Sequence, residues 1–334
     1  MVRVKGMLQT PTVWVLLDDR PGNASQALGV AEALGWSFET KKLSYTVSAR
    51  LPNLIRGASR IGLTAQSESI LRPPWPNIVV AAGRRIAPVA RWIKKKAQES
   101  IFLAQIMYPG NSGASEFDLI AVPNHDDDVA YKNAKGDQNV VLTTGAPHRL
   151  TDRRLRDEVG KWTGRINELP RPYIALLMGG ATQSRPFPID KAKDIVTRVS
   201  SMAATVDGSV LLSTSRRTGS AAEELILSSL REPRSVFLWS KGGENPYYAY
   251  LALADFVVVT GDSVSMCSEA CVNPGPVYIY APKGMVSAKH VRFHKELYAL
   301  EYAKPLGGSL DKWEHTPLNA ARDVAAAIRS RVDY

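Results

Sequence analysis

The chain has 334 residues, of which 45% are hydrophobic and 22% charged, and its formal net charge is +10. This composition is typical of a globular protein and excludes wholesale disorder, and the length predicts about two domains. The two cysteines, Cys267 and Cys271, exclude a disulfide scaffold and indicate a reducing compartment. The longest early apolar run, at residues 13–17, is shorter than the roughly 20 residues that cross a bilayer, and it lacks a signal-peptide cleavage pattern. We therefore expect a cytoplasmic protein.

Short apolar runs alternate with amphipathic stretches along the chain. In the first part, the runs predict strands at residues 13–19, 37–43, 77–83, 101–107, 117–123 and 140–145, and the amphipathic stretches predict helices at 24–34 and 86–97. In the second part, strands are predicted at 173–180, 209–215, 235–240, 256–261 and 277–281, and helices at 190–204 and 221–230. The runs are nearly continuous in Val, Ile, Leu and Ala, as in strands buried on both faces of a parallel sheet. We predict an α/β fold with two doubly wound, Rossmann-like domains that face a cleft.

The domain boundary is predicted at residues 165–172, where Pro170 and Pro172 favour an extended linker. The N-terminal domain would then span residues 1–165 and the C-terminal domain residues 172–315. A last helix within residues 316–334 could pack on either domain.

The positive charge is concentrated in the first domain. Between Lys41 and Lys96 there are twelve Lys or Arg residues and one acid, Glu68, so this stretch alone carries +11. Apolar side chains such as Leu54 and Trp75 are interleaved with the charges. This mixture suits the surface of an anionic membrane, and the alternatives are a nucleic acid or an ordinary solvated face. We expect an anionic membrane surface as the partner, and no nucleic acid.

Ligands of open parallel sheets bind beyond the carboxyl ends of the strands, so the residues after each run are the candidates for chemistry. The first run ends in Asp18 and Asp19, which could act as general bases or only favour the dipole of the following helix. Gly22 and Asn23 then suit a turn whose exposed amides attract an anion or a sugar hydroxyl. This turn lacks the pattern G-x-G-x-x-G, which disfavours a dinucleotide site.

The fifth run is followed by His125 and the three acids Asp126, Asp127 and Asp128. His125 could be a base that Asp126 orients, or the acids could hold a metal ion. No second ligand cluster accompanies them, so we expect no metal.

The second half has three polar clusters, each following a predicted strand. Two adjacent glycines let a ligand approach the backbone, arginines among hydroxyls form a cradle for an oxyanion, and a serine-rich helix start suits a diphosphate. Simple helix capping is the alternative for each cluster. The candidate nucleotide-binding residues are Gly179, Gly180, Ser213, Ser215, Arg216, Arg217, Gly261, Ser263, Ser265 and Glu269. Cys267 and Cys271 lack further ligands for zinc, and we interpret them as small core residues.

Two resemblances to known families accompany these clusters. The segment from Phe256 to Glu269 and Ala270, followed by Pro-Gly-Pro-Val-Tyr, resembles the donor-nucleotide motif of the GT-B glycosyltransferases. More narrowly, the chain resembles the elongated-mitochondria fission-factor family and its bacterial homologues, often labelled nucleoside-diphosphate-sugar epimerases. The segments that carry this resemblance are Asp18-Asp19-Arg20-Pro21-Gly22-Asn23 with Gln26, Gly83-Arg84-Arg85, Pro123-Asn124-His125-Asp126, Ser215-Arg216-Arg217-Thr218 and Asn245-Pro246-Tyr247.

The resemblance implies a nucleotide on the C-terminal domain and a last helix that crosses back to the N-terminal one. Glu269 would bind the ribose, and Ser263 and Ser265 the diphosphate. Asp262 departs from the motif, because it places a negative charge beside the phosphates. On the first domain, Asp19 or His125 would be the catalytic base. The acceptor side would comprise Gly22, Asn23, Gln26 and Arg84.

Two functions follow from different classes. The first is a metal-independent glycosyltransferase that takes a nucleotide-diphospho-sugar as its substrate, needs no covalently bound cofactor and acts on an envelope or lipid-linked acceptor. The second is a non-catalytic, membrane-associated scaffold that recruits a partner protein. Both would be peripheral on the inner face of a membrane. An epimerase of the short-chain-dehydrogenase type is disfavoured, because its N-terminal dinucleotide fingerprint is absent.

Overall fold

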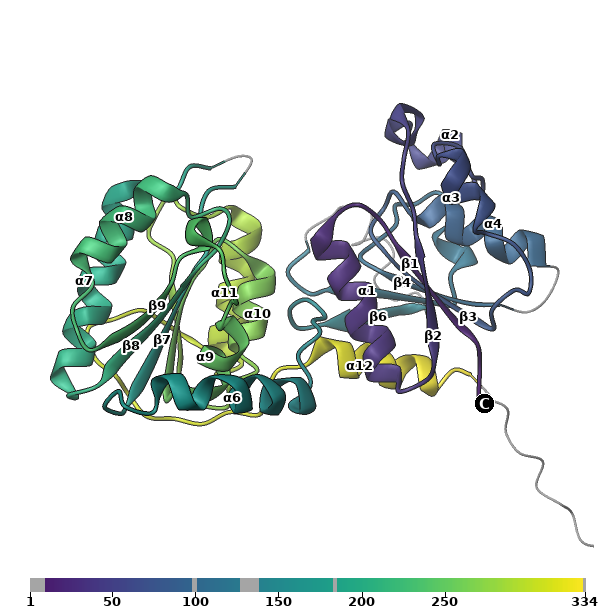
Figure 1. Ribbon diagram of the computed structural model, residues 1–334. Helices are drawn as coiled ribbons and strands as arrows, with labels where there is room; N and C mark the ends of the chain where they lie inside the picture. Colours follow the sequence, from purple (N-terminus) through teal and green to yellow (C-terminus); the bar gives the residue numbers. More distant parts are fainter. Residues whose placement is uncertain (1–9, 98–100, 127–137, 183–184, 333–334) are drawn as a thin grey trace, which may run out of the picture. The chain divides into compact units, whose positions relative to one another are not determined.

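The computed structural model describes residues 10–97, 101–126, 138–182 and 185–332, which form two compact units (Figure 1). Unit 1 comprises the described residues of 1–149 and 319–334, and unit 2 those of 150–318. The boundary therefore lies before the predicted linker at 165–172. Helix α6 (Asp152–Ile166) belongs to unit 2, because Ile166 is buried in its core and accepts a hydrogen bond of 3.1 Å from the hydroxyl of Tyr173. The two prolines follow this helix within unit 2.

Unit 1 contains a six-stranded parallel sheet in the order β2-β1-β3-β4-β5-β6. Its strands are β1 (Val13–Leu17), β2 (Phe38–Lys42), β3 (Ile78–Ala82), β4 (Phe102–Ile106), β5 (Leu119–Pro123) and β6 (Val140–Thr143). Each strand lies inside a predicted run. All residues of β1, β3 and β5 are buried, because helices cover both faces of the sheet.

The helices of unit 1 form a layer on each face of its sheet. They are α1 (Pro21–Leu34), α2 (Asn53–Arg56), α3 (Ala65–Ser69), α4 (Ala87–Ala97) and α12 (Ala320–Arg329), with the 3-10 turns η1 (Val47–Arg50) and η2 (Ala114–Glu116). Helices α1 and α12 share one apolar cluster, and α4 lies in the other. Helix α12 lies beside α1 (Figure 1), where Arg329 donates hydrogen bonds to the carbonyls of Ala33 at 2.9 Å and Leu34 at 3.2 Å. The last helix is thus part of unit 1.

Unit 2 contains a second six-stranded parallel sheet, in the order β12-β11-β10-β7-β8-β9. Its strands are β7 (Tyr173–Met178), β8 (Ser209–Thr214), β9 (Arg234–Phe237), β10 (Phe256–Thr260), β11 (Val277–Tyr280) and β12 (Lys304–Pro305). The first five correspond to predicted runs. Strand β12 was not predicted, because two residues including a proline leave no apolar pattern.

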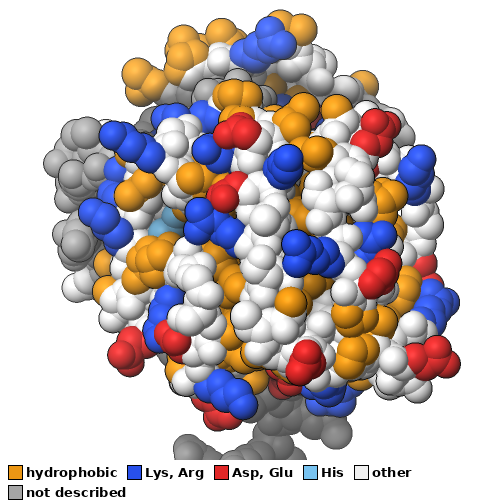
Figure 2. Space-filling model, turned by 90° about the vertical axis from the view of Figure 1, so that its left-hand side faces the viewer, with side chains coloured by type: hydrophobic (Ala, Val, Ile, Leu, Met, Phe, Trp, Pro, Cys, Tyr) orange, Lys and Arg blue, Asp and Glu red, His pale blue; other side chains and the backbone are white. Residues whose placement is uncertain are grey.

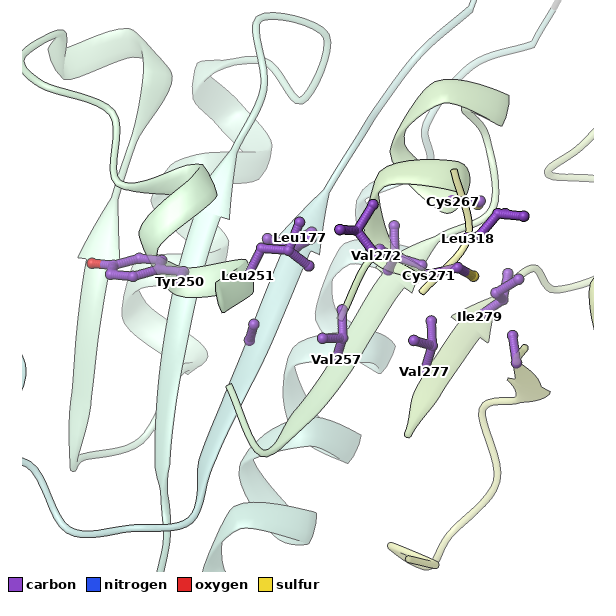
Figure 3. Packing of buried hydrophobic residues seen from close by; sticks show 14 of the residues in the cluster. Leu177, Tyr250, Leu251, Val257, Cys267, Cys271, Val272, Val277, Ile279 and Leu318 are labelled. Carbon is purple, nitrogen blue, oxygen red and sulfur yellow. The ribbon is translucent and has the colours of Figure 1, made fainter. Parts of the chain in front are cut away.

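Two helical layers also cover the sheet of unit 2. Besides α6, its helices are α7 (Ile189–Thr205), α8 (Ser220–Ser229), α9 (Tyr247–Leu253), α10 (Val264–Ala270) and α11 (Ala288–Ala299), with the turn η3 (Trp239–Lys241). Helices α7 and α8 pack on one face, and α9, α10 and α11 on the other. Figure 3 shows Cys267 and Cys271 within the second layer, close to Val277 and Leu318. Both thiols are free and fully buried, which confirms them as core residues.

Candidate functional site

Each sheet has a point where two neighbouring strands connect to helices on opposite faces. In unit 1 this point lies between β1, which leads to α1, and β3, which leads to α4. In unit 2 it lies between β7, which leads to α7, and β10, which leads to α10. The loops diverge at such a switch point and leave a crevice at the carboxyl ends of the strands, where ligands of this fold class bind.

The loops after β7 and β10 meet at the switch point of unit 2. The backbone amide of Gly179 donates to Oγ1 of Thr260 at 2.7 Å, and that of Gly180 donates to Oδ2 of Asp262 at 3.0 Å. Residues 81 and 82 positions apart in the chain are thereby joined. Two of the three predicted clusters therefore lie together.

Asp262 is held by an ion pair inside this junction. Its side chain is 2% exposed, and its Oδ2 lies 2.6 Å from Nη1 of Arg217, which also donates to the carbonyl of Gly180 at 3.0 Å. The guanidinium compensates the negative charge that departs from the glycosyltransferase motif. Asp262 and Arg217 thus hold the loops after β7, β8 and β10 together.

Ser215, Arg217 and Thr218, which follow β8, also bond within this junction. The hydroxyls of Ser215 and Thr218 both donate to the carbonyl of Gly179, the first at 3.0 Å. Arg216 is exposed, and it has no hydrogen-bond or ion-pair partner among the residues that the structure describes. It is the guanidinium of this cluster that a soluble anion could reach.

The three glycines among the predicted nucleotide-binding residues lie against atoms of the chain itself. A Cβ on Gly180 would lie 2.1 Å from the carbonyl oxygen of Arg217, and one on Gly179 would lie 2.3 Å from the Asp262 carboxylate. A Cβ on Gly261 would lie 2.4 Å from the ring of His294. These residues are glycines because neighbouring segments approach them closely, whether or not a ligand binds.

Helix α10 carries the predicted ribose and diphosphate residues. Ser263 caps it, with Oγ accepting from the amide of Met266 at 3.3 Å, and Ser265 is half-buried in the first turn. Glu269, near the other end, accepts a hydrogen bond of 2.8 Å from the hydroxyl of Tyr247. Burial raises the pKa of Glu269 to about 7, although this hydrogen bond and the charge of Arg154 both lower it. Glu269 is therefore a carboxyl group that titrates near neutral pH.

A short polar path connects Glu269 with the end of β8. Ser213 donates to Oδ1 of Asn245 at 3.2 Å, and the same oxygen accepts from the amide of Tyr247 at 3.0 Å. Sequence reasoning placed residues 245–247 in a family segment without giving Tyr247 a role. Its contact with Glu269 depends on α9 packing beside α10, which no local pattern shows.

Two histidines on α11 were also missed. His294 is buried against Gly261, and desolvation lowers its pKa to about 4, so that it is neutral at physiological pH. His290 is half-buried, with Nδ1 lying 2.7 Å from Oγ of Ser287. The sequence signal that could have identified them is their spacing of four residues on one helix.

The switch point of unit 1 contains the predicted base. The Asp18 side chain is buried and accepts from Nδ2 of Asn23 and from the amide of Arg20, each at 3.0 Å, so its role is structural. The Asp19 side chain is 59% exposed and forms an ion pair with Arg85. Asp19 is thus the acid at this switch point that a substrate could reach.

Other predicted residues of the first domain have different surroundings. Asn23 donates a hydrogen bond to Asp18, Gly22 is exposed with open space around it, and Gln26 is half-buried. His125 is buried after β5. Asp127 and Asp128 lie outside the described residues. Within the described part of the chain, no three His, Cys, Asp or Glu residues are grouped as metal ligands.

Asp19 and Arg84 line a groove of about 990 Å³ in unit 1. The groove is bounded by the loops after β1, β3 and β4 and by the segment of η1 and α2. Its charged lining residues are Asp19, Arg20, Arg50, Arg56, Arg84 and Arg85. The crevice expected at this switch point is therefore open and strongly basic.

The family follows from comparison with known proteins. A family model described as "Mitochondrial fission ELM1" matches residues 21–332. The chain belongs to this family. It is 30% identical over 346 residues to "Uncharacterized protein RP120" of Rickettsia prowazekii (strain Madrid E), covering 95% of this chain and 97% of that protein. It is 31% identical over 278 residues to "Mitochondrial fission protein ELM1" of Arabidopsis thaliana, covering 76% of this chain and 63% of the plant protein, so it spans less than two thirds of that relative.

Solved structures show the fold. The UDP-GlcNAc 2-epimerase of Methanocaldococcus jannaschii matches with a TM-score of 0.55 at 13% identity, covering 96% of this chain and 99% of that one. The enzyme of Neisseria meningitidis, bound to UDP-GlcNAc, matches with a TM-score of 0.51 at 11% identity over 96% and 91%. The predicted pair of Rossmann-like, GT-B-like α/β domains is confirmed. Because UDP-GlcNAc 2-epimerases have this fold, the exclusion of dehydrogenase-type epimerases does not extend to them.

Proposed function

We propose that unit 2 binds a nucleotide-diphospho-sugar at the switch point between β7 and β10, and that the protein transfers the sugar without a metal ion. The observation that carries this proposal is the meeting of three strand-end loops at the start of α10, the helix that also carries the half-buried Glu269. The fold supports it, since two solved relatives of this fold are complexes with UDP-GlcNAc. The acceptor we propose is an envelope or lipid-linked molecule.

In this proposal each polar group of the site has one task. Ionised Glu269 accepts hydrogen bonds from the ribose hydroxyls, while Tyr247 orients it. Arg216, which is exposed, pairs with the diphosphate, because a guanidinium donates two parallel hydrogen bonds to phosphate oxygens. Ser263 and Ser265 offer hydroxyls to the same group.

Transfer requires a base for the acceptor hydroxyl. Its oxygen forms the new bond to the anomeric carbon, the bond to the diphosphate breaks, and the hydroxyl proton moves to the base. We propose Asp19 for this step, because its carboxylate is exposed at the switch point of unit 1. His125 is the alternative, and its burial after β5 makes it the less accessible of the two.

A screen for ligand-dependent stability tests the donor site. We expect one of the UDP-, GDP-, ADP- or CMP-sugars to raise the melting temperature, since a ligand at 100 times its Kd stabilises a protein by about 2.7 kcal/mol. Glu269→Ala and Arg216→Ala should each weaken this effect. Arg198→Ala, an exposed arginine on α7, is the matched control and should not. If no nucleotide sugar stabilises the chain, the donor proposal is wrong.

Product analysis then separates the possible reactions. Release of free nucleoside diphosphate in the presence of an acceptor extract supports transfer. Conversion of the donor into its sugar epimer without release would contradict transfer and indicate epimerase chemistry. Both outcomes are read from one chromatogram of the nucleotide products.

A non-catalytic scaffold is the second candidate, and one observation favours it. The glycines and hydroxyls that could admit a nucleotide are largely occupied by the chain itself, as at Gly180 and Ser215. The named plant relative is a mitochondrial fission protein. A scaffold is supported if nucleotide sugars leave the stability unchanged and the site variants still bind a partner protein normally.

Both candidates are proposed to act at the cytoplasmic face of a membrane, through the basic stretch between Lys41 and Lys96. No helix in the described part of the chain is long and apolar enough to cross a bilayer. We propose that attachment depends on the basic surface of unit 1.

A further inference from the structure

The basic groove of unit 1 has an excess of positive charge that the protein does not neutralise. Five arginines and one acid line it. The acid, Asp19, is paired with Arg85. Arg20, Arg50 and Arg56 have no acidic partner among the residues that the structure describes. A groove of this charge attracts an anion.

Arg56 is the strongest indication of a bound anion. It is 2% exposed, and its Nε and Nη1 donate to the carbonyls of Ile61 at 3.1 Å and Arg85 at 2.9 Å. Its Nη2 is buried and has no hydrogen-bond partner in the described part of the chain. A buried guanidinium is costly unless a charge or hydrogen bond compensates it, and burial lowers the pKa of Arg56 accordingly. An anion in the groove would provide that compensation.

Hydrogen bonds and a cation–π contact hold the walls of the groove in place. Nδ2 of Asn53, at the start of α2, donates to the carbonyls of Arg84 at 2.8 Å and Pro109 at 3.1 Å. These bonds tie α2 to the loops after β3 and β4. In the same loop after β3, the guanidinium of Arg85 lies 4.3 Å from the centre of the Tyr45 ring. The side chains of Arg56 and Arg85 are thus held in place before a ligand arrives, which reduces the entropic cost of binding.

The rim of the groove is apolar and exposed. Val47 on η1 is 76% exposed, Leu54 on α2 is 80% exposed, and Leu51 between them is 42% exposed. All three line the groove. The segment that holds α2 projects from the rest of unit 1 (Figure 1). A soluble anion would make no use of these side chains.

We propose that the groove binds the phosphate headgroup of a membrane lipid, while Val47, Leu51 and Leu54 enter the hydrocarbon layer. An anionic headgroup complements the arginines, and an acyl chain complements the apolar rim. This inference rests on the membrane contact that the proposed function assigns to unit 1 and deepens it, and it applies to a transferase and a scaffold alike. It also locates membrane contact in one groove rather than across the whole basic stretch.

Vesicle sedimentation of the full chain tests the charged part of the site. Three kinds of vesicle are compared: phosphatidylcholine alone, with phosphatidylglycerol, and with phosphatidic acid, the last two matched in surface charge. We expect the strongest binding to phosphatidic acid, whose terminal phosphate can enter the groove. Equal binding to both anionic lipids, or binding to none, would overturn the proposal.

A charge-matched pair of variants separates the groove from the remaining basic surface. Arg20→Gln with Arg50→Gln should reduce binding to phosphatidic acid vesicles about tenfold or more, because each loses a charged hydrogen-bond donor. Lys42→Gln with Lys96→Gln removes the same charge at exposed positions outside the groove, and should reduce it about twofold or less at physiological salt. Equal losses in the two pairs would refute a specific groove. Arg56→Gln is added only if its circular dichroism shows a folded protein.

The apolar rim distinguishes a lipid from a soluble phosphate. Val47→Ser with Leu54→Ser should abolish most vesicle binding, and Ile189→Ser, an exposed control on α7, should not change it. Inorganic pyrophosphate or an RNA oligonucleotide that binds as tightly as phosphatidic acid vesicles, with no loss in the rim variant, would overturn the lipid assignment. Nucleotide-sugar stabilisation, measured on the same variants, should be unaffected, so that failure of this inference and failure of the donor proposal remain distinguishable.

Discussion

The two units have the same kind of crevice at their sheets and use it in opposite ways. In unit 2, the loops of the switch point pack on one another through Asp262, Arg217 and the backbone of Gly180. In unit 1, the corresponding loops diverge around a groove of about 990 Å³ that arginines line. The fold therefore determines where a ligand could bind, while a few loop side chains determine whether that place is filled by the protein.

The two units also differ in their surface charge. Figure 2 shows the outer helical face of unit 2, where basic and acidic side chains are interspersed. Pairs such as Arg198 and Asp194, 3.0 Å apart on α7, neutralise each other there. The stretch between Lys41 and Lys96 in unit 1 has one acid for twelve basic residues, and acids outside the stretch pair with only some of these, as Glu116 does with Arg91. An anionic surface would therefore attract unit 1 more strongly than this face of unit 2.

The largest expected effect concerns the catalytic base, which we propose lies in unit 1. If unit 1 supplies the base, Asp19→Asn should lower the rate of transfer about 10²- to 10⁴-fold and leave nucleotide-sugar affinity unchanged. Rates are measured by release of nucleoside diphosphate, and affinity by calorimetry. His125→Gln is the comparison. A normal rate in Asp19→Asn with a large loss in His125→Gln would assign the base to His125.

Two glycine substitutions test the difference in packing directly. Gly180→Ala should lower the free energy of unfolding by about 2–4 kcal/mol, because its Cβ would meet the backbone of Arg217 at 2.1 Å. Gly22→Ala, in unit 1, should be neutral or stabilising by up to about 1 kcal/mol, since it lies in a helix with nothing within 4 Å of the new Cβ. Urea denaturation measures both values. Similar losses in the two variants would contradict the contrast between a filled and an open switch point.

The carboxyl of Glu269 should make unit 2 sensitive to pH. Its pKa is raised from 4.5 to about 7, so its contribution to stability is full below pH 4.5 and is lost as the pH rises to 7. Glu269→Gln does not ionise and should gain stability relative to the wild type by about 1–3 kcal/mol between pH 5 and pH 8. Thermal or urea unfolding at both pH values measures this difference. If the difference in stability between Glu269→Gln and the wild type is the same at pH 5 and at pH 8, Glu269 titrates in its ordinary range.

How far the sequence predicts these features depends on how local their causes are. The buried strands were predictable, because nearly continuous apolar runs such as β7 and β10 have no other stable position in an α/β protein. The two compact units divide before the predicted boundary at 165–172, and Pro170 and Pro172 lie between α6 and β7 inside unit 2. The division between the two units, between Arg149 and Leu150, has no such sequence marker.

The ends of the strands, where a site could lie, were predictable from the sequence, but the contacts of the residues there were not. Strand ends could be located, so Asp19 and Gly180 could be placed in loops after β1 and β7, and Glu269 on the helix that follows β10. Their partners could not be, since a pairing such as that of Tyr247 with Glu269 joins residues 22 positions apart on two different helices. Arg56 illustrates the same limit: a charged residue in a basic stretch is expected to be exposed, and only the packing of η1 and α2 buries it.

The smallest expected effect concerns the neighbour of Glu269. Tyr247 lowers the pKa of this carboxyl by donating a hydrogen bond to it, so Tyr247→Phe should raise that pKa further, by about one pH unit. If ionised Glu269 accepts the ribose hydroxyls, nucleotide-sugar affinity rises with pH through about 7 in the wild type and through a higher pH in the variant. Tyr248→Phe, the adjacent tyrosine, is the control and should leave the midpoint unchanged. Calorimetric titrations across this pH range measure the two midpoints, and coincident midpoints would separate Glu269 from nucleotide binding while leaving the headgroup groove of unit 1 untouched.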